Sequence, residues 1–261
     1  MKSGGLLLLV LLAVLAGCRT LPPAPPVAPG LTADQILSRL EARQKGLSSF
    51  ALRGRLVLLS PRQNATGTAL IKGKLPETLR VDLKDPLGRS VLNFATDGRV
   101  VELLFPRENK LLRGPATPTN LAAFIPPGVS LPQTLRLLVA DLPLSEGPPT
   151  RMRYEPGEGL YVLEWLQGDG SLRERLWVQA QGILPRKEEW YGTGGRLAFK
   201  AELDEFDRQA SPRPRRLKLI SPGPKVELRL TYKDFTPNPS LTPAALAVPR
   251  PPGVRILPLK P

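Results

Sequence analysis

A period-two alternation of apolar and polar side chains runs through most of this chain and constrains its fold more than any other feature. It is clearest in TLRVDLK, residues 78–84, and in KVELRLTYK, residues 225–233. Strands of this kind bury one face and leave the other in water, which is typical of antiparallel sheets. Weaker versions of the pattern lie in Phe50–Leu59, Thr66–Lys74, Ser90–Thr96, Arg99–Phe105, Leu160–Leu166, Leu172–Val178, Leu184–Trp190 and Arg196–Phe206.

Short turn signals separate several of these segments. Sequential strands joined by hairpins predict one large, strongly curved antiparallel sheet, a half-barrel. The turn signals are Asp97-Gly98, Gly157-Glu158-Gly159, Gly168-Asp169-Gly170 and Gly194-Gly195.

Helices are few and fall at two places. Thr32 with Gln35 forms a capping-box pattern before ADQILSRLEARQK, and Gly46 is the expected stop. A short second helix is expected from Thr117 and Pro118 through Leu121 and Phe124.

A third helix is expected where Ser130 with Gln133 repeats the capping box before TLRLLVADLP. A curved sheet with few helices buries its concave face only if those helices cover it. The predicted fold class is therefore mainly β (α+β), with an N-terminal helix and a mid-chain helical lid.

The N-terminus reads as an export signal. Lys2 precedes an apolar run from Leu6 to Ala16, which is far shorter than the roughly 20 residues that span a bilayer. Leu15-Ala16-Gly17-Cys18 resembles the bacterial lipobox, and Cys18 is the only cysteine. We expect Cys18 to be acylated, and the resemblance implies that Arg19 at the next position favours the outer membrane.

These features predict four segments along the chain. Residues 1–17 are a lipoprotein signal peptide, and residues 18–30 are the anchor and a tether made extended by its prolines. Residues 31–236 form the half-barrel domain, and residues 237–261 are a Pro-rich C-terminal extension.

The formal net charge is +14. Export removes most nucleic-acid partners and leaves anionic lipid or acidic surfaces. Most charges are spread singly along the alternating strands. RQASPRPRRLK, residues 208–218, is the one dense basic cluster, and we interpret it as a solvated loop that leads into a strand.

The sequence offers no recognisable catalytic chemistry. It contains no histidine, which excludes histidine bases, histidine triads and histidine-ligated metals. Glu188 and Glu189 point to opposite faces of a strand and cannot share a substrate, so we expect surface charges there and in ELDEFD, residues 202–207. GTGG, residues 192–195, lacks the Lys-Ser/Thr of a phosphate loop. No enzymatic activity, cofactor or metal is predicted.

Several stretches resemble the LolB family, outer-membrane lipoproteins that receive other lipoproteins from the periplasmic carrier LolA. The similarity rests on the lipobox, on the order of the predicted elements and on four sequence segments. They are RGRLVL (53–58), DPLGRSVLNF (85–94), LRLLVADLP (135–143) and LRLTYKDFTPNP (228–239).

The resemblance implies an apolar cavity between sheet and lid that holds acyl chains. Inward-facing residues line either this cavity or the core, and the sequence leaves both open. The candidates are Leu79, Val81, Leu83, Leu92, Phe94, Leu135, Leu138, Leu228 and Leu230.

The turn DPLG lies where the family carries a loop whose exposed leucine helps place cargo in the membrane. Pro86 and Gly88 are turn residues. Leu87 between them either folds back and packs on the sheet, or it is exposed and can contact an apolar partner. With the resemblance, we expect Leu87 to project into solvent and this turn to meet a membrane or partner.

The leading hypothesis is a lipid-anchored outer-membrane lipoprotein, facing the periplasm, that accepts acylated lipoproteins from a LolA-like carrier. It would help insert them into the membrane and would bind no nucleic acid. Two alternatives stay open: a structural scaffold in an envelope assembly, and a carrier or sensor of free lipids.

Overall fold

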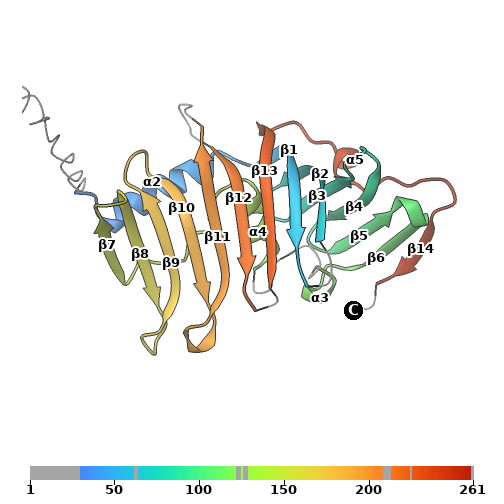
Figure 1. Cartoon of the computed structure of the whole chain (residues 1–261). Coiled ribbons are helices and arrows are strands. Elements are labelled where there is room, and N and C mark those ends of the chain that lie inside the picture. The colour runs from blue at the N-terminus through green and yellow to red at the C-terminus, as the bar shows by residue number, and fades with distance from the viewer. Residues whose placement is uncertain are drawn as a thin grey trace, which may run out of the picture.

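The computed structural model describes residues 30–61, 64–121, 125, 129–207, 213–223 and 225–259. Fourteen strands form one sheet in the order β14-β6-β5-β4-β3-β2-β1-β13-β12-β11-β10-β9-β8-β7 (Figure 1). The strands are β1 Ser49–Leu59, β2 Asn64–Lys74, β3 Thr78–Lys84, β4 Ser90–Thr96, β5 Val100–Phe105, β6 Lys110–Pro115, β7 Arg151–Glu155, β8 Leu160–Leu166, β9 Leu172–Gln179, β10 Leu184–Tyr191, β11 Leu197–Phe206, β12 Pro214–Ser221, β13 Val226–Pro237 and β14 Arg255–Pro258.

The sheet confirms the predicted large antiparallel fold. Every pairing is antiparallel except that of β14 with β6, and the sheet stays open because β14 and β7 end it instead of pairing. Each of the ten predicted strand segments overlaps an observed strand. Strands β6, β7 and β14 were not identified from sequence, and β12 was expected only as the strand into which the basic cluster leads.

The helices begin where the capping residues predict. Helix α2, Ala33–Lys45, follows Thr32, whose Oγ1 accepts a hydrogen bond from Gln35 N at 3.3 Å. Helix α4, Leu131–Leu138, has the same arrangement with Ser130 and Gln133. Helix α3 spans Pro118–Leu121, whereas Phe124 lies outside the described residues. A further short helix, α5, spans Pro243–Leu246. Two 3-10 turns, η1 at Pro106–Glu108 and η2 at Thr193–Gly195, complete the elements.

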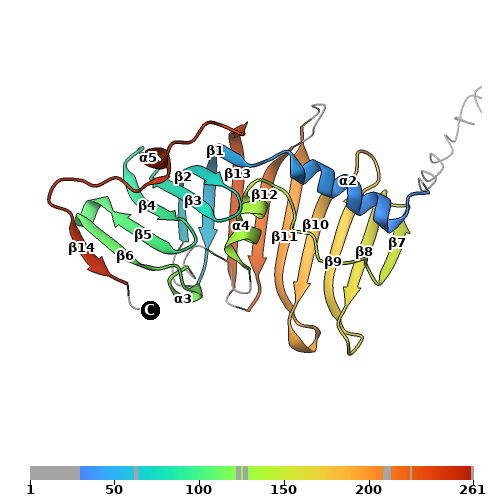
Figure 2. The same cartoon turned by 180° about the vertical axis from the view of Figure 1, so that it is seen from behind.

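Helices α2 and α4 lie on one face of the sheet, which we call the inner face. Figure 2 shows α2 crossing the strands from β11 to β7, with α4 beside β12 and β13. The buried side chains of both helices belong to one core cluster with Phe50, Leu52 and Leu230 of β1 and β13. These helices therefore bury the part of the inner face that they cover, and the opposite, outer face carries most of the polar strand residues.

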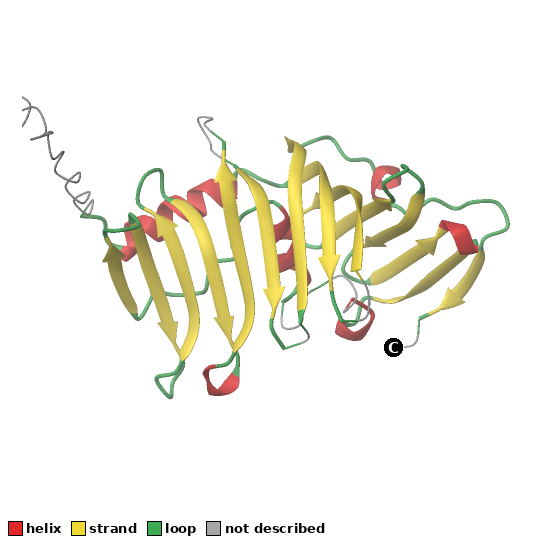
Figure 3. Cartoon of the chain, in the orientation of Figure 1, coloured by secondary structure: helices red, strands yellow, loops and turns green. Residues whose placement is uncertain are grey.

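The C-terminal extension is docked and not free. Val248 is buried against Ala95, Leu104 and Leu111 on the outer face, and β14 adds a strand beside β6. Beyond β14, Leu259 N donates to the carbonyl oxygen of Arg113 at 2.8 Å. The extension thus joins the same sheet as the half-barrel and covers its β6 edge (Figure 3).

The predicted signal peptide, Cys18 and the tether up to Pro29 fall outside the described residues. Within the described ranges, no helix has the length and apolar character needed to cross a bilayer.

Candidate functional site

One half of the inner face is filled. Beneath α2, most inner side chains of β8 to β11 are fully covered. Leu163, Leu176, Phe199 and Leu203 are each 1% exposed or less. This half is packed core and leaves no room for a ligand without movement.

The other half of the inner face is open. On β13, β1, β3 and β4, beyond α4, apolar side chains pack against the core but stay partly exposed to solvent. We call this surface the open apolar face. It consists of Leu56, Val81, Leu83, Leu92 and Leu228.

The predicted lining residues divide between core and open face. Five of them are buried: Leu79, Phe94, Leu135, Leu138 and Leu230. The other four, Val81, Leu83, Leu92 and Leu228, belong to the open apolar face. None of the nine lines either of the two cavities described below.

The turn between β3 and β4 presents Leu87 to solvent, with 76% of its surface exposed. Asp85 holds this turn: its Oδ1 accepts hydrogen bonds from Leu87 N at 2.9 Å and Arg89 N at 3.0 Å. Its Oδ2 accepts from Arg107 Nη2 at 2.6 Å. Gly88 takes a positive φ of 82°, which glycine adopts without strain. The leucine therefore sits on a fixed turn at the end of two strands of the open half.

The pKa of the Asp85 carboxyl is consistent with its role as the hydrogen-bond acceptor of this turn. Burial acts to raise the pKa of the Asp85 carboxyl, but the hydrogen bonds from Arg89 and Leu87 outweigh it, and the pKa lies below its ordinary value. Asp85 thus stays ionised and keeps its acceptor role throughout the neutral range.

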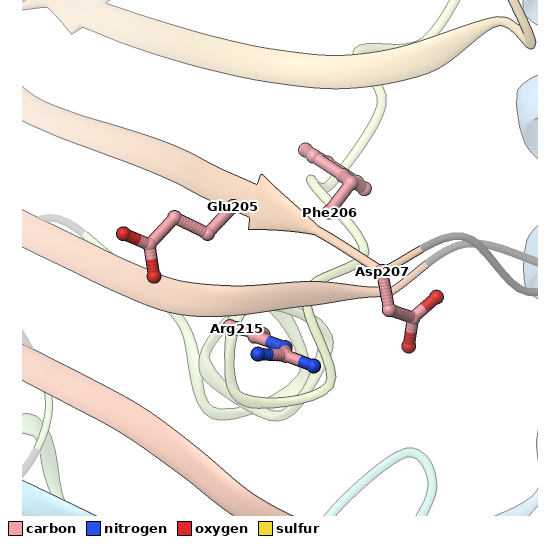
Figure 4. A pocket seen from close by; sticks show the side chains of 4 residues that line it. All are labelled: Glu205, Phe206, Asp207 and Arg215. Atoms are coloured by element: carbon pink, nitrogen blue, oxygen red, sulfur yellow. The ribbon is translucent and has the colours of Figure 1, made fainter.

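A charged groove lies where β11 and β13 end and β12 begins, near the C-terminal end of α4. It has a volume of about 820 Å³, and its lining includes Val139, Arg213, Tyr232, Lys233 and Phe235. A second cavity of about 600 Å³ adjoins it, lined by Glu205, Phe206, Asp207 and Arg215. In Figure 4, the carboxyl groups of Glu205 and Asp207 point to opposite sides of the strand end.

Sequence reasoning misjudged Glu188. The expectation of surface charge is wrong there, because Glu188 is 0% exposed and lies between Leu176 of β9 and Ala201 of β11. Glu189 points to the opposite face, as expected from alternation, yet it is also largely buried. Both faces of β10 are covered at this point, which the alternation alone does not reveal.

Glu174 of β9 is buried close to Glu188. Burial raises the pKa of both carboxyls, and the charge of Glu174 raises the pKa of Glu188 further. Ser145 donates to Glu174. Neither oxygen of Glu188 makes a hydrogen bond of good geometry among the described residues, although the Trp190 indole and the Glu174 carboxyl lie close enough to affect its pKa. The part of the chain that the structure describes holds no group of three or more metal-ligating side chains.

The fold is shared with solved structures of the LolA superfamily. A LolA superfamily protein from Nitrosomonas europaea is 19% identical, with a TM-score of 0.54, over 84% of this chain and 99% of that one. A domain from Vibrio parahaemolyticus, named for outer membrane lipoprotein sorting, is 14% identical, with a TM-score of 0.52 over 82% and 97%.

A DUF1329 family protein from Desulfovibrio piger is 13% identical, with a TM-score of 0.57 over 81% of this chain and 94% of that one. No protein family model matches the chain, and a search of curated proteins finds no match. The broad LolA-like fold expected from sequence is thus confirmed, at the level of fold alone.

Proposed function

We propose that this protein is a lipid-anchored lipoprotein of the outer membrane that accepts acylated lipoproteins from a LolA-like periplasmic carrier. It passes them to the membrane without catalysing a reaction. The observation that carries this proposal is the open apolar face, which ends at a fixed turn with Leu87 in solvent. The lipobox at Cys18 and the LolA-like fold support it.

The proposed mechanism is apolar transfer. Each CH₂ group removed from water contributes about 0.8 kcal/mol, so an acyl chain moves toward the surface that buries it better. The open apolar face offers partly exposed leucine and valine side chains to such a chain. An exposed leucine on a fixed turn can then enter the lipid boundary at little conformational cost.

The test separates binding from delivery. A carrier loaded with a labelled acylated lipoprotein is mixed with the full-length protein and then with liposomes. Leu87→Glu is expected to leave thermal stability and acyl binding unchanged and to reduce membrane insertion at least several-fold. The matched control is Ile256→Glu, because Ile256 is also exposed, at 55%, but lies on β14 at the far edge of the sheet.

Two results would contradict the proposal. If Leu87→Glu and the parent insert the lipoprotein into liposomes equally well, the Leu87 turn has no role in membrane delivery. Depletion of the protein in its own bacterium without accumulation of lipoproteins on the carrier would remove the acceptor role.

A second candidate function is a scaffold in an envelope assembly. The filled half of the inner face favours it, because a packed interior binds no acyl chain. Under this alternative, the full-length protein would take no labelled lipoprotein from the carrier.

A further inference from the structure

The charged groove, where β11 and β13 end and β12 begins, is lined by cations that form no ion pair among the described residues. Arg213, Arg215 and Lys233 line it, and within the described part of the chain none of the three forms an ion pair. Unpaired arginines are costly to gather in one place, because like charges repel. Stability alone therefore does not explain why these three cations line one groove, and a bound anion would explain it.

The acidic residues of the lining do not neutralise them. Glu205 is paired with Arg216, and Asp234 is paired with Arg53, and neither of these arginines lines the groove. Asp207 accepts a hydrogen bond from Arg213 N at 3.1 Å, which fixes the backbone of the turn and not the guanidinium. The lining thus holds three cations and three carboxylates, and two of the carboxylates are already paired with arginines outside the groove.

Arg213 is held in place on its apolar side. Its guanidinium lies 4.0 Å from the ring centroid of Phe235, a cation–π contact. Beneath it, Tyr232 is fixed because its hydroxyl donates to the carbonyl oxygen of Leu138 at 3.0 Å. A guanidinium oriented in this way keeps its N–H donors free for an anion that enters from solvent.

A second guanidinium adds to the positive potential. Arg43 of α2 is partly buried nearby; burial lowers its pKa, the charges of Asp141 and Asp207 act to raise it, and the charge of Arg213 acts to lower it. The buried Asp141 follows α4, and burial raises its pKa to about 6 against the opposing effect of Arg43, Arg136 and Arg213. Asp141 and Asp207 thus both act on Arg43, while Arg213 lines the groove beside it.

We propose that this groove binds an anionic head group, a phosphate or a phosphate ester, on Arg213, Arg215 and Lys233. Its volume of about 820 Å³ falls within the range of small-molecule sites, roughly 300–1,000 Å³. Val139, Phe235 and Pro237 supply apolar contacts beside the cations. This site lies apart from the open apolar face, so it does not depend on the acceptance of acyl chains.

The test is calorimetric titration of the full-length protein in nonionic detergent. The three probes are inorganic phosphate, dihexanoyl phosphatidylglycerol and dihexanoyl phosphatidylcholine, each with an empty-micelle titration subtracted. Phosphatidylglycerol is expected to bind and phosphatidylcholine is not. Tighter binding of phosphatidylglycerol than of phosphate supports a lipid head group as the ligand, and equal binding supports a free phosphate.

Substitutions in the groove test whether phosphatidylglycerol binds there. Arg213→Gln is expected to weaken phosphatidylglycerol binding about tenfold. Lys233→Gln should also weaken this binding, and because Lys233 is exposed, the substitution is not expected to disturb the fold. The matched control is Arg229→Gln, on the same strand as Lys233 but paired with Glu227 away from the groove. The proposal is overturned if neither anion binds, if phosphatidylcholine binds equally, or if both lining variants bind like the parent.

Discussion

Replacing Glu188 by methionine is expected to stabilise this protein. The carboxyl group is completely buried on the inner face beside the Glu174 carboxyl, and neither of its oxygens makes a hydrogen bond of good geometry among the described residues. A buried polar group without a partner costs about 1–3 kcal/mol, and methionine has nearly the same length without that cost. Since 1 kcal/mol shifts the Tm of a domain of this size by about 2–4 °C, the gain is readily measured.

The gain depends on pH in a defined direction. Burial and then the charge of Glu174 raise the pKa of Glu188 above its ordinary value. The folded protein therefore keeps a proton that the unfolded chain releases once the pH exceeds about 4.5. Stability falls as the pH rises from this value through the raised pKa, so Glu188→Met should gain more at pH 8 than at pH 5.

Thermal unfolding followed by circular dichroism at these two pH values measures both effects. The matched control is Glu189→Met, because Glu189 points to the opposite face and accepts a hydrogen bond from Lys187 Nζ at 2.8 Å. Burial acts to raise the pKa of Glu189, but Lys187 and Tyr191 outweigh it and the pKa is lowered. Glu189→Met should therefore give no gain. A lower Tm for Glu188→Met at pH 8, or equal gains at both pH values, would refute the reasoning.

Two further substitutions test the open half of the sheet. Asp85→Ala should speed amide hydrogen exchange at Leu87 while hardly changing Tm, because Asp85 is the acceptor that fixes the turn; unchanged exchange would contradict this role. Gly67→Ala should destabilise by about 1–3 kcal/mol in urea unfolding, because a Cβ there would lie 2.2 Å from the carbonyl oxygen of Lys84. Gly46→Ala, where a Cβ meets nothing within 4 Å, is its control and should be neutral or slightly stabilising.

The strands and helix starts were predictable because their signals are local. A strand such as β3 alternates along its own sequence, and Ser130 caps α4 through a residue only three positions away. Strand β14 was not predictable, because it exists only through its pairing with β6, more than a hundred residues earlier. No local pattern in a Pro-rich tail encodes such a partner.

The candidate site divides in the same way. The turn around Leu87 was predictable from four consecutive residues, but its exposure was expected only from the family resemblance, and Leu87 is indeed exposed. The burial of Glu188 could not be predicted, because alternation assigns a face but not what covers that face. The charged groove was hidden for a different reason: Arg213, Lys233 and Val139 come from three separate elements.

The inner face combines two features that stability alone does not favour. It leaves leucine and valine side chains partly in water beyond α4, although a few more covering residues would bury them. It also keeps Glu174 and Glu188 beneath the chain that follows α4, although apolar side chains would pack there at lower cost. Proteins retain such costs mainly at functional sites. Because both features lie on one continuous face, the function of this sheet is best sought on its inner side, between the filled half and the turn that carries Leu87.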